Sequence, residues 1–445
     1  NGPAAWRTPL ILPWSAWIEK LWDAALYRGL QLPARLDPDQ ELLTWERIIE
    51  VSAGPDTLLD LPAAAEAASG SWQLLCSWRL DLDSIPSDGS EDVLAFLDWA
   101  RLFLQRSQAE NWLEFARWSD RLIPVLDRLA LPARIILAGF DEITPQQQAF
   151  LDACGRLGVQ CHLAGAPARL ATERFRIAVP DPNQELHIAA LWARALLERG
   201  QARTIAVIVP NLESRRTEVE RAFLRVLDPA RLLPGPSSPS PAFNLAAPPP
   251  LIAQPLVRSA LLALQLDPEQ NSADLVGRLL RSSFFMDADS ERPLRARLDA
   301  LLRDRGIARI SVARLRALCR SLTPPCKRFR LALRRWLYRR QQLPELQSPS
   351  SWARAFALLL RALGWPGERP LSSDEFQALE AWNESLARLA RLDRVAARFT
   401  YREALAQLER ILARTPFQPQ GLHAPIQILG LWEAAGLEFD ALWIC

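Results

Sequence analysis

The sequence lacks several features that would place it quickly in a class. Its six cysteines form no CxxC pair and it has only three histidines, which argues against a metal site of the zinc type. No apolar run reaches the length of a membrane span, and the opening NGPAAWRTPLILPW has neither the basic start nor the long apolar run of a signal peptide. We therefore expect a cytoplasmic protein with reduced thiols and no membrane partner.

Lysine is also scarce, because Lys20 and Lys327 are the only two, and arginine carries almost all of the positive charge. The formal net charge of +2 conceals an uneven distribution. Between Glu291 and Arg340 the sequence has 16 Lys or Arg residues against 3 Asp or Glu. An excess of this size in one block favours a nucleic acid or an acidic partner.

Within this block, the stretch PPCKRFRLALRRWLYRRQQ predicts a helix in which aromatic residues alternate with cations. Arginine suits contacts with phosphates, and exposed aromatic faces can stack on bases. A solvated basic helix whose aromatic residues face the core fits the pattern equally well. The candidate DNA-binding residues are Lys327, Arg328, Arg334, Arg335, Trp336, Arg339 and Arg340.

A chain of 445 residues predicts two to four domains. Residues 14–130 have helical periodicity, with Trp14, Trp17, Ile18, Leu21 and Trp22 on one helical face. Ten of the 17 tryptophans precede residue 120. This favours a Trp-rich helical core over a base-stacking surface, which would need exposed tryptophan.

The next segment has the pattern of an α/β protein. Ile135–Ala138 predicts a strand, Thr144 and Pro145 predict the start of a helix, and VQCHLAG predicts a second strand. A strand–helix–strand unit of this length implies parallel pairing. The same reasoning predicts strands at Phe175–Val179 and Thr204–Val209, with helices at about 183–199 and 212–227.

Residues from about 256 to 414 are again helical, and the sequence closes with the strand–turn–strand pattern QILGLWEAAGLEFDALWIC. A return to strands after so long a helical stretch indicates a helical domain inserted into an α/β domain.

Three stretches, in this order, resemble a known family: IILAGFDEITPQQQAFL, IAVIVPNLESRRTEVERAF and LWEAAGLEFDALWI. They resemble superfamily 1 DNA helicases of the UvrD/RecB type, and within these the AddB-type subunit of helicase–nucleases and the probable DNA repair proteins. The resemblance implies an α/β fold with large all-α insertions, in which two partial RecA-like parallel-sheet domains each carry a helical insertion. The implied segments are 1–130 (first insertion), 131–172 (first RecA-like domain), 173–255 (second RecA-like domain), 256–414 (second, basic insertion) and 415–445 (return of the second domain).

The resemblance also implies a nucleotide site, whose residues here depart from the family's pattern. No GxxxxGK[ST] loop occurs in these residues; the resemblance implies that such a loop would lie before Asn1 and the nuclease domain of the relatives beyond Cys445. Asp141 and Glu142 fall two residues later than the family's acidic pair, and Gly430, Trp432 and Ala435 replace its Thr, His and Lys. The remnant of the site would comprise Gly139, Phe140, Asp141, Glu142, Gln146, Gly436 and Glu438.

These departures predict a motor-inactive, DNA-binding, helicase-like part of a helicase–nuclease that processes double-strand-break ends in recombinational repair. Its expected partners are DNA, as duplex ends or single strands, and a helicase–nuclease partner subunit. We predict no catalytic residue and no cofactor within these residues, with ATP and Mg²⁺ bound only if an upstream loop exists. Two alternatives stay open: an active ATP-dependent helicase, and a basic scaffold for an acidic protein.

Overall fold

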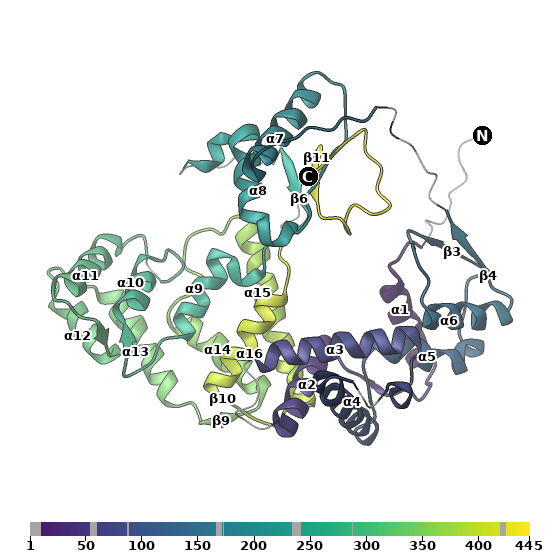
Figure 1. Ribbon diagram of the computed structural model, residues 1–445. Helices are drawn as coiled ribbons and strands as arrows, with labels where there is room; N and C mark the ends of the chain where they lie inside the picture. The colour runs from purple at the N-terminus through teal and green to yellow at the C-terminus, as the bar shows by residue number, and fades with distance from the viewer. Residues whose placement is uncertain are drawn as a thin grey trace, which may run out of the picture. The chain divides into compact units, whose positions relative to one another are not determined.

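The computed structural model describes residues 10–53, 60–86, 89–165, 171, 173–233, 242–286, 288–418 and 424–445. The chain divides into two compact units, residues 1–169 and residues 170–445, which we call unit 1 and unit 2. Helices predominate in both units, and each unit contains a small parallel sheet (Figure 1). None of the described helices is both long and apolar enough to cross a bilayer.

Unit 1 is built mainly from helices. They are α1 (Trp14–Tyr27), α2 (Pro38–Ala53), α3 (Leu61–Trp78), α4 (Glu91–Ala109), α5 (Trp118–Leu122) and α6 (Pro145–Arg156). Three 3₁₀ helices join them: η1 (Leu82–Ser84), η2 (Phe115–Arg117) and η3 (Ile123–Arg128). The strands are β1 (Ala34–Arg35), β2 (Trp112–Leu113), β3 (Arg134–Ala138) and β4 (Gln160–Ala164).

Tryptophan forms much of the core of unit 1, as the sequence predicts. Trp45 stacks on Phe103 with ring centroids 4.2 Å apart, and Trp22 stacks on Trp118 at 5.3 Å. Ile18, Leu21 and Trp22 of α1 are buried, and Trp14 and Trp17 pack against the same cluster. The buried rings of Trp22, Trp45 and Trp118 are therefore unavailable for stacking on bases, whereas Trp78 is 43% exposed.

Charged groups are also buried in unit 1. The carboxylate of Glu114 is fully buried and accepts hydrogen bonds from the indole N–H of Trp72 at 2.8 Å and from Arg117 Nη2 at 2.8 Å. Nearby, Glu41 of α2 accepts a hydrogen bond from the Ser69 hydroxyl at 2.8 Å. Burial raises the pKa of Glu41 to about 7.

The predicted strand–helix–strand unit is confirmed. β3 and β4 pair in parallel, with Ile135 opposite Cys161, and α6 connects them. Thr144 and Gln147 form a capping box, in which the Thr144 hydroxyl accepts from the Gln147 N–H and the Gln147 side chain accepts from the Thr144 N–H. One side of this sheet is left open, since Ile136 and Leu163 are more than half exposed.

Unit 2 contains a parallel sheet and a long series of helices. The sheet and its helices are α7 (Pro182–Glu198), β5 (Ile205–Ile208), α8 (Leu212–Leu227), β6 (Phe243–Leu245), β11 (Ile426–Leu429) and β12 (Ala441–Ile444). Between β6 and β11 lie α9 (Pro255–Leu264), α10 (Ala273–Arg281), α11 (Arg292–Asp304), α12 (Val312–Ser321), α13 (Lys327–Gln341), α14 (Pro349–Ala362), α15 (Ser373–Arg391) and α16 (Tyr401–Arg414). Short elements complete the unit: η4 (Pro229–Leu232), η5 (Leu251–Ala253), η6 (Leu392–Arg394), β7 (Asn271–Ser272), β8 (Arg309–Ile310), β9 (Leu346–Gln347) and β10 (Phe399–Thr400).

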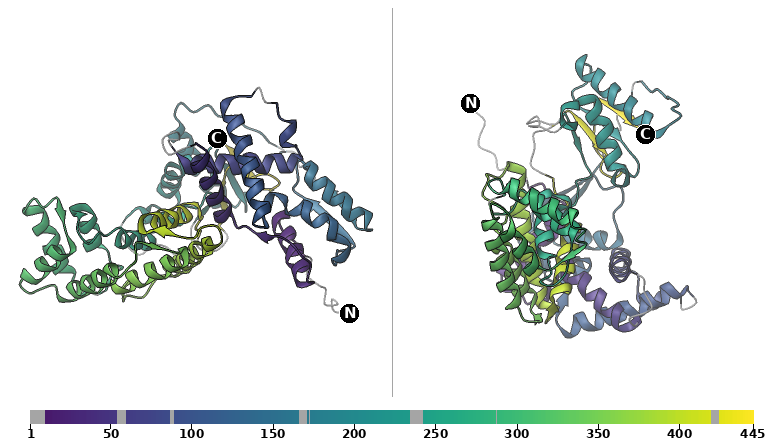
Figure 2. Two further views of the ribbon diagram at one scale, coloured as in Figure 1. Left: turned by 90° about the horizontal axis from the view of Figure 1, so that it is seen from below. Right: turned by 90° about the vertical axis from the view of Figure 1, so that its left-hand side faces the viewer.

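The sheet of unit 2 shows that α9–α16 are an insertion. Its strand order is β12-β5-β11-β6, and every neighbouring pair is parallel. Ile205 of β5 lies between Ile426 of β11 and Ala441 of β12, which follow it by more than 200 residues. Figure 2 shows the two C-terminal strands, in yellow, beside the teal elements of this unit. The α/β class with many helices is therefore present, and the helices α9–α16 stand in the sequence between strands of one sheet.

One face of the sheet packs on α7 and α8. Ile205 and Val207 of β5 are completely buried against Ala189 of α7 and Phe223 of α8. The other face is polar toward its β6 edge, where the Asn244 side-chain amide donates to the side-chain oxygen of Gln427 at 2.9 Å.

The prediction of a strand at Phe175–Val179 is wrong. No strand is assigned there, and Phe175 and Ile177 are mostly exposed. A strand needs a neighbour to bond its backbone groups, and none of the described strands pairs with this stretch.

Candidate nucleic-acid interface

The predicted basic helix forms as α13 and packs between α12 and α14 in the insertion (Figure 1). Its buried stripe is Phe329, Ala332, Leu333 and Trp336, which recur at helical spacing. The opposite side carries the exposed residues Lys327, Arg328, Arg334, Arg335, Tyr338 and Arg339. The helix therefore presents its cations to solvent and its apolar residues to the core.

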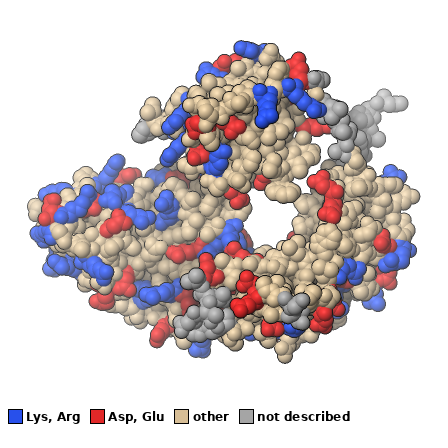
Figure 3. All heavy atoms as spheres, in the orientation of Figure 1, with Lys and Arg blue, Asp and Glu red and all other residues tan. Residues whose placement is uncertain are grey.

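Most of these exposed cations have no acidic neighbour. Ion pairs in the insertion join other residues, such as Arg281 with Asp299 at 2.9 Å. Within the described ranges, the ion pairs involve none of Lys327, Arg334, Arg335 and Arg339. Figure 3 shows Lys and Arg gathered at the left of the view, over the end of the insertion where α11 and α12 lie. A row of cations without internal partners attracts a polyanion.

Two of the seven predicted DNA-binding residues do not belong to this surface. Trp336 is completely buried, so it is a core residue and cannot stack on a base. Arg340 is only partly exposed, and its guanidinium lies 3.9 Å from the ring centroid of Tyr401. A cation held over an aromatic ring in this way contributes to packing within the insertion.

The N-terminus of α13 is held by a residue that sequence reasoning missed. The buried carboxylate of Glu291 accepts the backbone N–H groups of Arg328 and Phe329, both at 2.8 Å, and the thiol of Cys326 at 3.2 Å. It therefore satisfies two of the unpaired N–H groups at this helix end and complements the helix dipole. Hydrogen bonding to Cys319, burial and Glu291 together raise the pKa of Cys326 well above its ordinary value.

The first part of the expected nucleotide remnant lies in unit 1, in the turn after β3. Gly139 has a φ of +75°, which favours glycine, and Phe140 packs edge-on against Trp14 with ring centroids 6.4 Å apart. Asp141 and Glu142 follow as exposed residues. The turn thus has an acidic pair that is solvated, beyond the end of the strand.

Gln146 has a partner within unit 1. Its side-chain amide donates to the carbonyl oxygen of Ala116 and to the carboxylate of Asp120, both at 2.7 Å. These bonds tie the start of α6 to the segment around η2. In this geometry the Gln146 amide stabilises the packing of unit 1. A nucleotide-binding role for Gln146 stays a prediction.

The remaining remnant residues lie in unit 2, in the turn between β11 and β12. Gly436 has a φ of +73°, and Glu438 is exposed. Gly430 is buried, and a side chain there would displace the carboxylate of the exposed Glu433. Trp432, which stands where the family has histidine, is 89% exposed. The expected nucleotide remnant is therefore divided between the two units, with Gly139–Glu142 and Gln146 in unit 1 and Gly436 and Glu438 in unit 2.

Asp440, at the end of the same turn, bonds to the backbone just before β5. Its carboxylate accepts the backbone N–H groups of Arg203 and Thr204 at 2.8 and 3.0 Å, and its own N–H bonds to the Thr204 carbonyl at 3.0 Å. The hydrogen bonds from Arg203 and Thr204 lower the pKa of Asp440. Asp440 therefore sets the register of β12 on β5, which gives a physical reason for an aspartate at this point of the closing motif.

The described residues include no group of three or more His, Cys, Asp or Glu side chains arranged to hold a metal ion, and the six cysteines are free thiols. Neither models of known protein families nor curated proteins give a match to this chain. The interface must therefore be judged from its own geometry.

Proposed function

We propose that this chain is a DNA-binding, helicase-like part of an enzyme that processes double-strand-break ends in recombinational repair, and that its motor site is inactive. The observation that carries the proposal is the row of exposed cations on α13, of which Lys327, Arg334, Arg335 and Arg339 lack an acidic partner among the described residues. Phosphate groups of a DNA strand would supply the missing counter-charge.

The topology of unit 2 gives further support to the helicase-like part of the proposal. A parallel sheet interrupted by a long helical insertion is the arrangement that the resemblance of the three stretches implies. The two RecA-like domains, the helicase–nuclease partner subunit and the cytoplasmic location stay part of the proposal.

The proposal of an inactive motor follows from the residues in the turn after β3. Asp141 and Glu142 are exposed there, and the Gln146 amide is engaged by Ala116 and Asp120. With its acidic pair in solvent and its glutamine amide already engaged, the turn offers no prepared site for Mg²⁺ and a phosphate.

A titration of the full chain with short blunt-ended duplexes and with single strands tests DNA binding. We expect the affinity to fall steeply as salt rises from about 50 to 200 mM, because each neutralised phosphate releases counterions. The variant Lys327→Gln/Arg334→Gln/Arg335→Gln should make the slope of log affinity against log salt less steep by about 2–3, since each of three phosphate contacts contributes about 0.7–0.9.

The matched control removes the same charge from paired, exposed arginines elsewhere: Arg101→Gln/Arg194→Gln/Arg278→Gln. This variant should keep nearly the full slope. Undetectable binding, or equal slopes for the two triple variants, would contradict the proposal. Unchanged DNA binding combined with lost binding of an acidic peptide would instead favour the scaffold alternative.

A further inference from the structure

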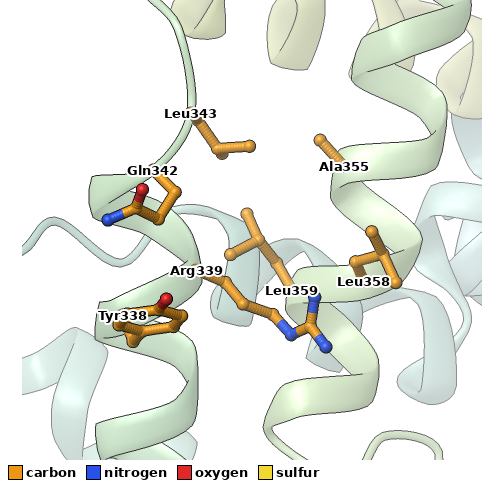
Figure 4. A pocket seen from close by; sticks show the side chains of 7 residues that line it. All are labelled: Tyr338, Arg339, Gln342, Leu343, Ala355, Leu358 and Leu359. Carbon is orange, nitrogen blue, oxygen red and sulfur yellow. The ribbon is translucent and has the colours of Figure 1, made fainter.

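A small hollow opens between α13 and α14, beside the cation row (Figure 4). Leu343 and the buried Leu359 form its apolar floor, the partly exposed Leu358 stands at its mouth, and Tyr338, Arg339 and Gln342 add polar groups to its lining. Figure 4 shows the Arg339 side chain reaching from α13 toward Leu358 on α14. An apolar floor with a few polar groups at the rim is the usual composition of a small-molecule site.

The size of the hollow limits what can enter it. Its volume is about 180 Å³, whereas sites for drug-sized ligands hold roughly 300–1,000 Å³. One planar ring system fits this volume better than a larger ligand does. The leucine floor favours an apolar ring over a bare phosphate, because Arg339 is the one cation in the lining that could offset the cost of desolvating that charge.

The rim residues are aligned with the cations. Tyr338 is four residues after Arg334 and three after Arg335, so the three side chains are neighbours on the helix surface. Gln342 follows Tyr338 by one further turn. The Tyr338 ring is 67% exposed although it is aromatic, and a ring in this position is open to stacking.

We infer that the hollow receives one unstacked base of a single-stranded nucleic acid, which stacks on Tyr338 while its flanking phosphates bond to Arg334, Arg335 and Arg339. The inference rests on the proposed DNA binding and adds a preference for single strands over duplex. The charge of the cation row favours a nucleic acid, and the ring-sized apolar hollow favours a base that is free of its own helix. The amide of Gln342 can bond to polar atoms on the edge of that base.

The test compares Tyr338→Ala and Tyr338→Phe in the full chain, titrated with a thymine-only single strand and with a duplex of equal length. Loss of one base–aromatic stack costs about 1–3 kcal/mol, so Tyr338→Ala should weaken single-strand binding by about 5- to 150-fold. Tyr338→Phe keeps the ring and should bind as the unaltered chain does. Duplex binding should change less than about twofold, because phosphates supply it.

Tyr27→Ala is the control, since Tyr27 is a still more exposed tyrosine, on α1 in unit 1. Leu358→Glu is a second probe of the hollow itself, and a carboxylate at its mouth should weaken single-strand binding again. If Tyr338→Ala and Leu358→Glu leave single-strand binding unchanged while the α13 triple variant still loses it, the base site is wrong and the proposed function stands. If the unaltered chain binds neither oligonucleotide, both are wrong. If only an acidic peptide loses affinity in Tyr338→Ala, the hollow serves a protein partner and the inference is overturned.

Discussion

Arg117 in unit 1 and Arg334 on α13 face opposite kinds of surroundings. Arg117 forms a two-pronged contact with the buried carboxylate of Glu114, in a cluster that also contains Trp72. Arg334 is exposed and has no ion-pair partner among the described residues. Both arginines carry the same charge. The residues around each one therefore decide whether its guanidinium stabilises the fold or can bind a ligand.

Removal of Glu114 should have the largest effect on stability. Glu114→Ala leaves the Arg117 guanidinium and the Trp72 N–H without their buried partner, and breaking a buried pair in this way costs about 3–5 kcal/mol. Urea unfolding measures the change. Asp98→Ala is the control, because Asp98 and Arg101 form an exposed pair whose loss costs at most about 1 kcal/mol. Equal midpoints for the two variants would show that the buried cluster is not essential.

The pH dependence of stability should report on Glu41. Its pKa is raised from 4.5 to about 7 in the folded state, so the folded chain binds this proton more tightly than the unfolded chain does. The free energy of unfolding should therefore fall as the pH rises from about 4.5 to 7, in total by on the order of 3 kcal/mol. Glu41→Gln keeps an acceptor for Ser69 and should remove this dependence. Parallel curves of unfolding free energy against pH for the two chains would contradict the assignment.

Loss of the Glu291 cap should have an intermediate effect. Glu291→Ala leaves the N–H groups of Arg328 and Phe329 unsatisfied at the start of α13, which costs about 1–3 kcal/mol. Glu345→Ala, just beyond the same helix and exposed, should change the unfolding free energy by less than about 0.5 kcal/mol. Thermal unfolding of both variants measures the difference, and equal melting temperatures would contradict the capping role.

Neutralisation of Arg334 should have the smallest effect on stability. It also separates most clearly an arginine that stabilises the fold from one that binds DNA. Arg334→Gln should change the unfolding free energy by less than about 0.5 kcal/mol while weakening DNA binding. Arg117→Gln should clearly lower the free energy of unfolding. The folded fraction of this variant should bind DNA with unaltered salt dependence. A matched loss of stability in both variants would remove the distinction between the two arginines.

Much of the fold follows from local patterns that the sequence contains. The periodicity of residues 14–27, the cap at Thr144 and the apolar strand before α8 predict elements that the structure has, with boundaries within a few residues. These predictions succeed because they rest on neighbours within one element. The strand expected at Phe175–Val179 fails because strand pairing depends on residues elsewhere in the chain.

The candidate interface was only partly predictable for the same reason. The spacing of Phe329, Leu333 and Trp336 repeats at four and seven residues, and this signal separates the buried Trp336 from the exposed Tyr338. No local signal identifies Glu291 as the cap of α13, because it lies more than 30 residues before the N–H groups that it accepts. The absence of ion-pair partners around Arg334 is likewise a property of the packed chain.

The position of β5 between β11 and β12 constrains the order of events during synthesis. Among the described strands β5 pairs with β11 and β12 alone, and residues 426–444 leave the ribosome about 220 residues after β5 itself. At roughly 5–20 residues per second this interval is roughly 10–45 s, during which the α9–α16 insertion can fold. During this interval α7 and α8 can cover Ile205 and Val207, but the backbone groups at both edges of β5 stay unpaired. The nascent chain is therefore exposed to aggregation until β11 and β12 have been synthesised.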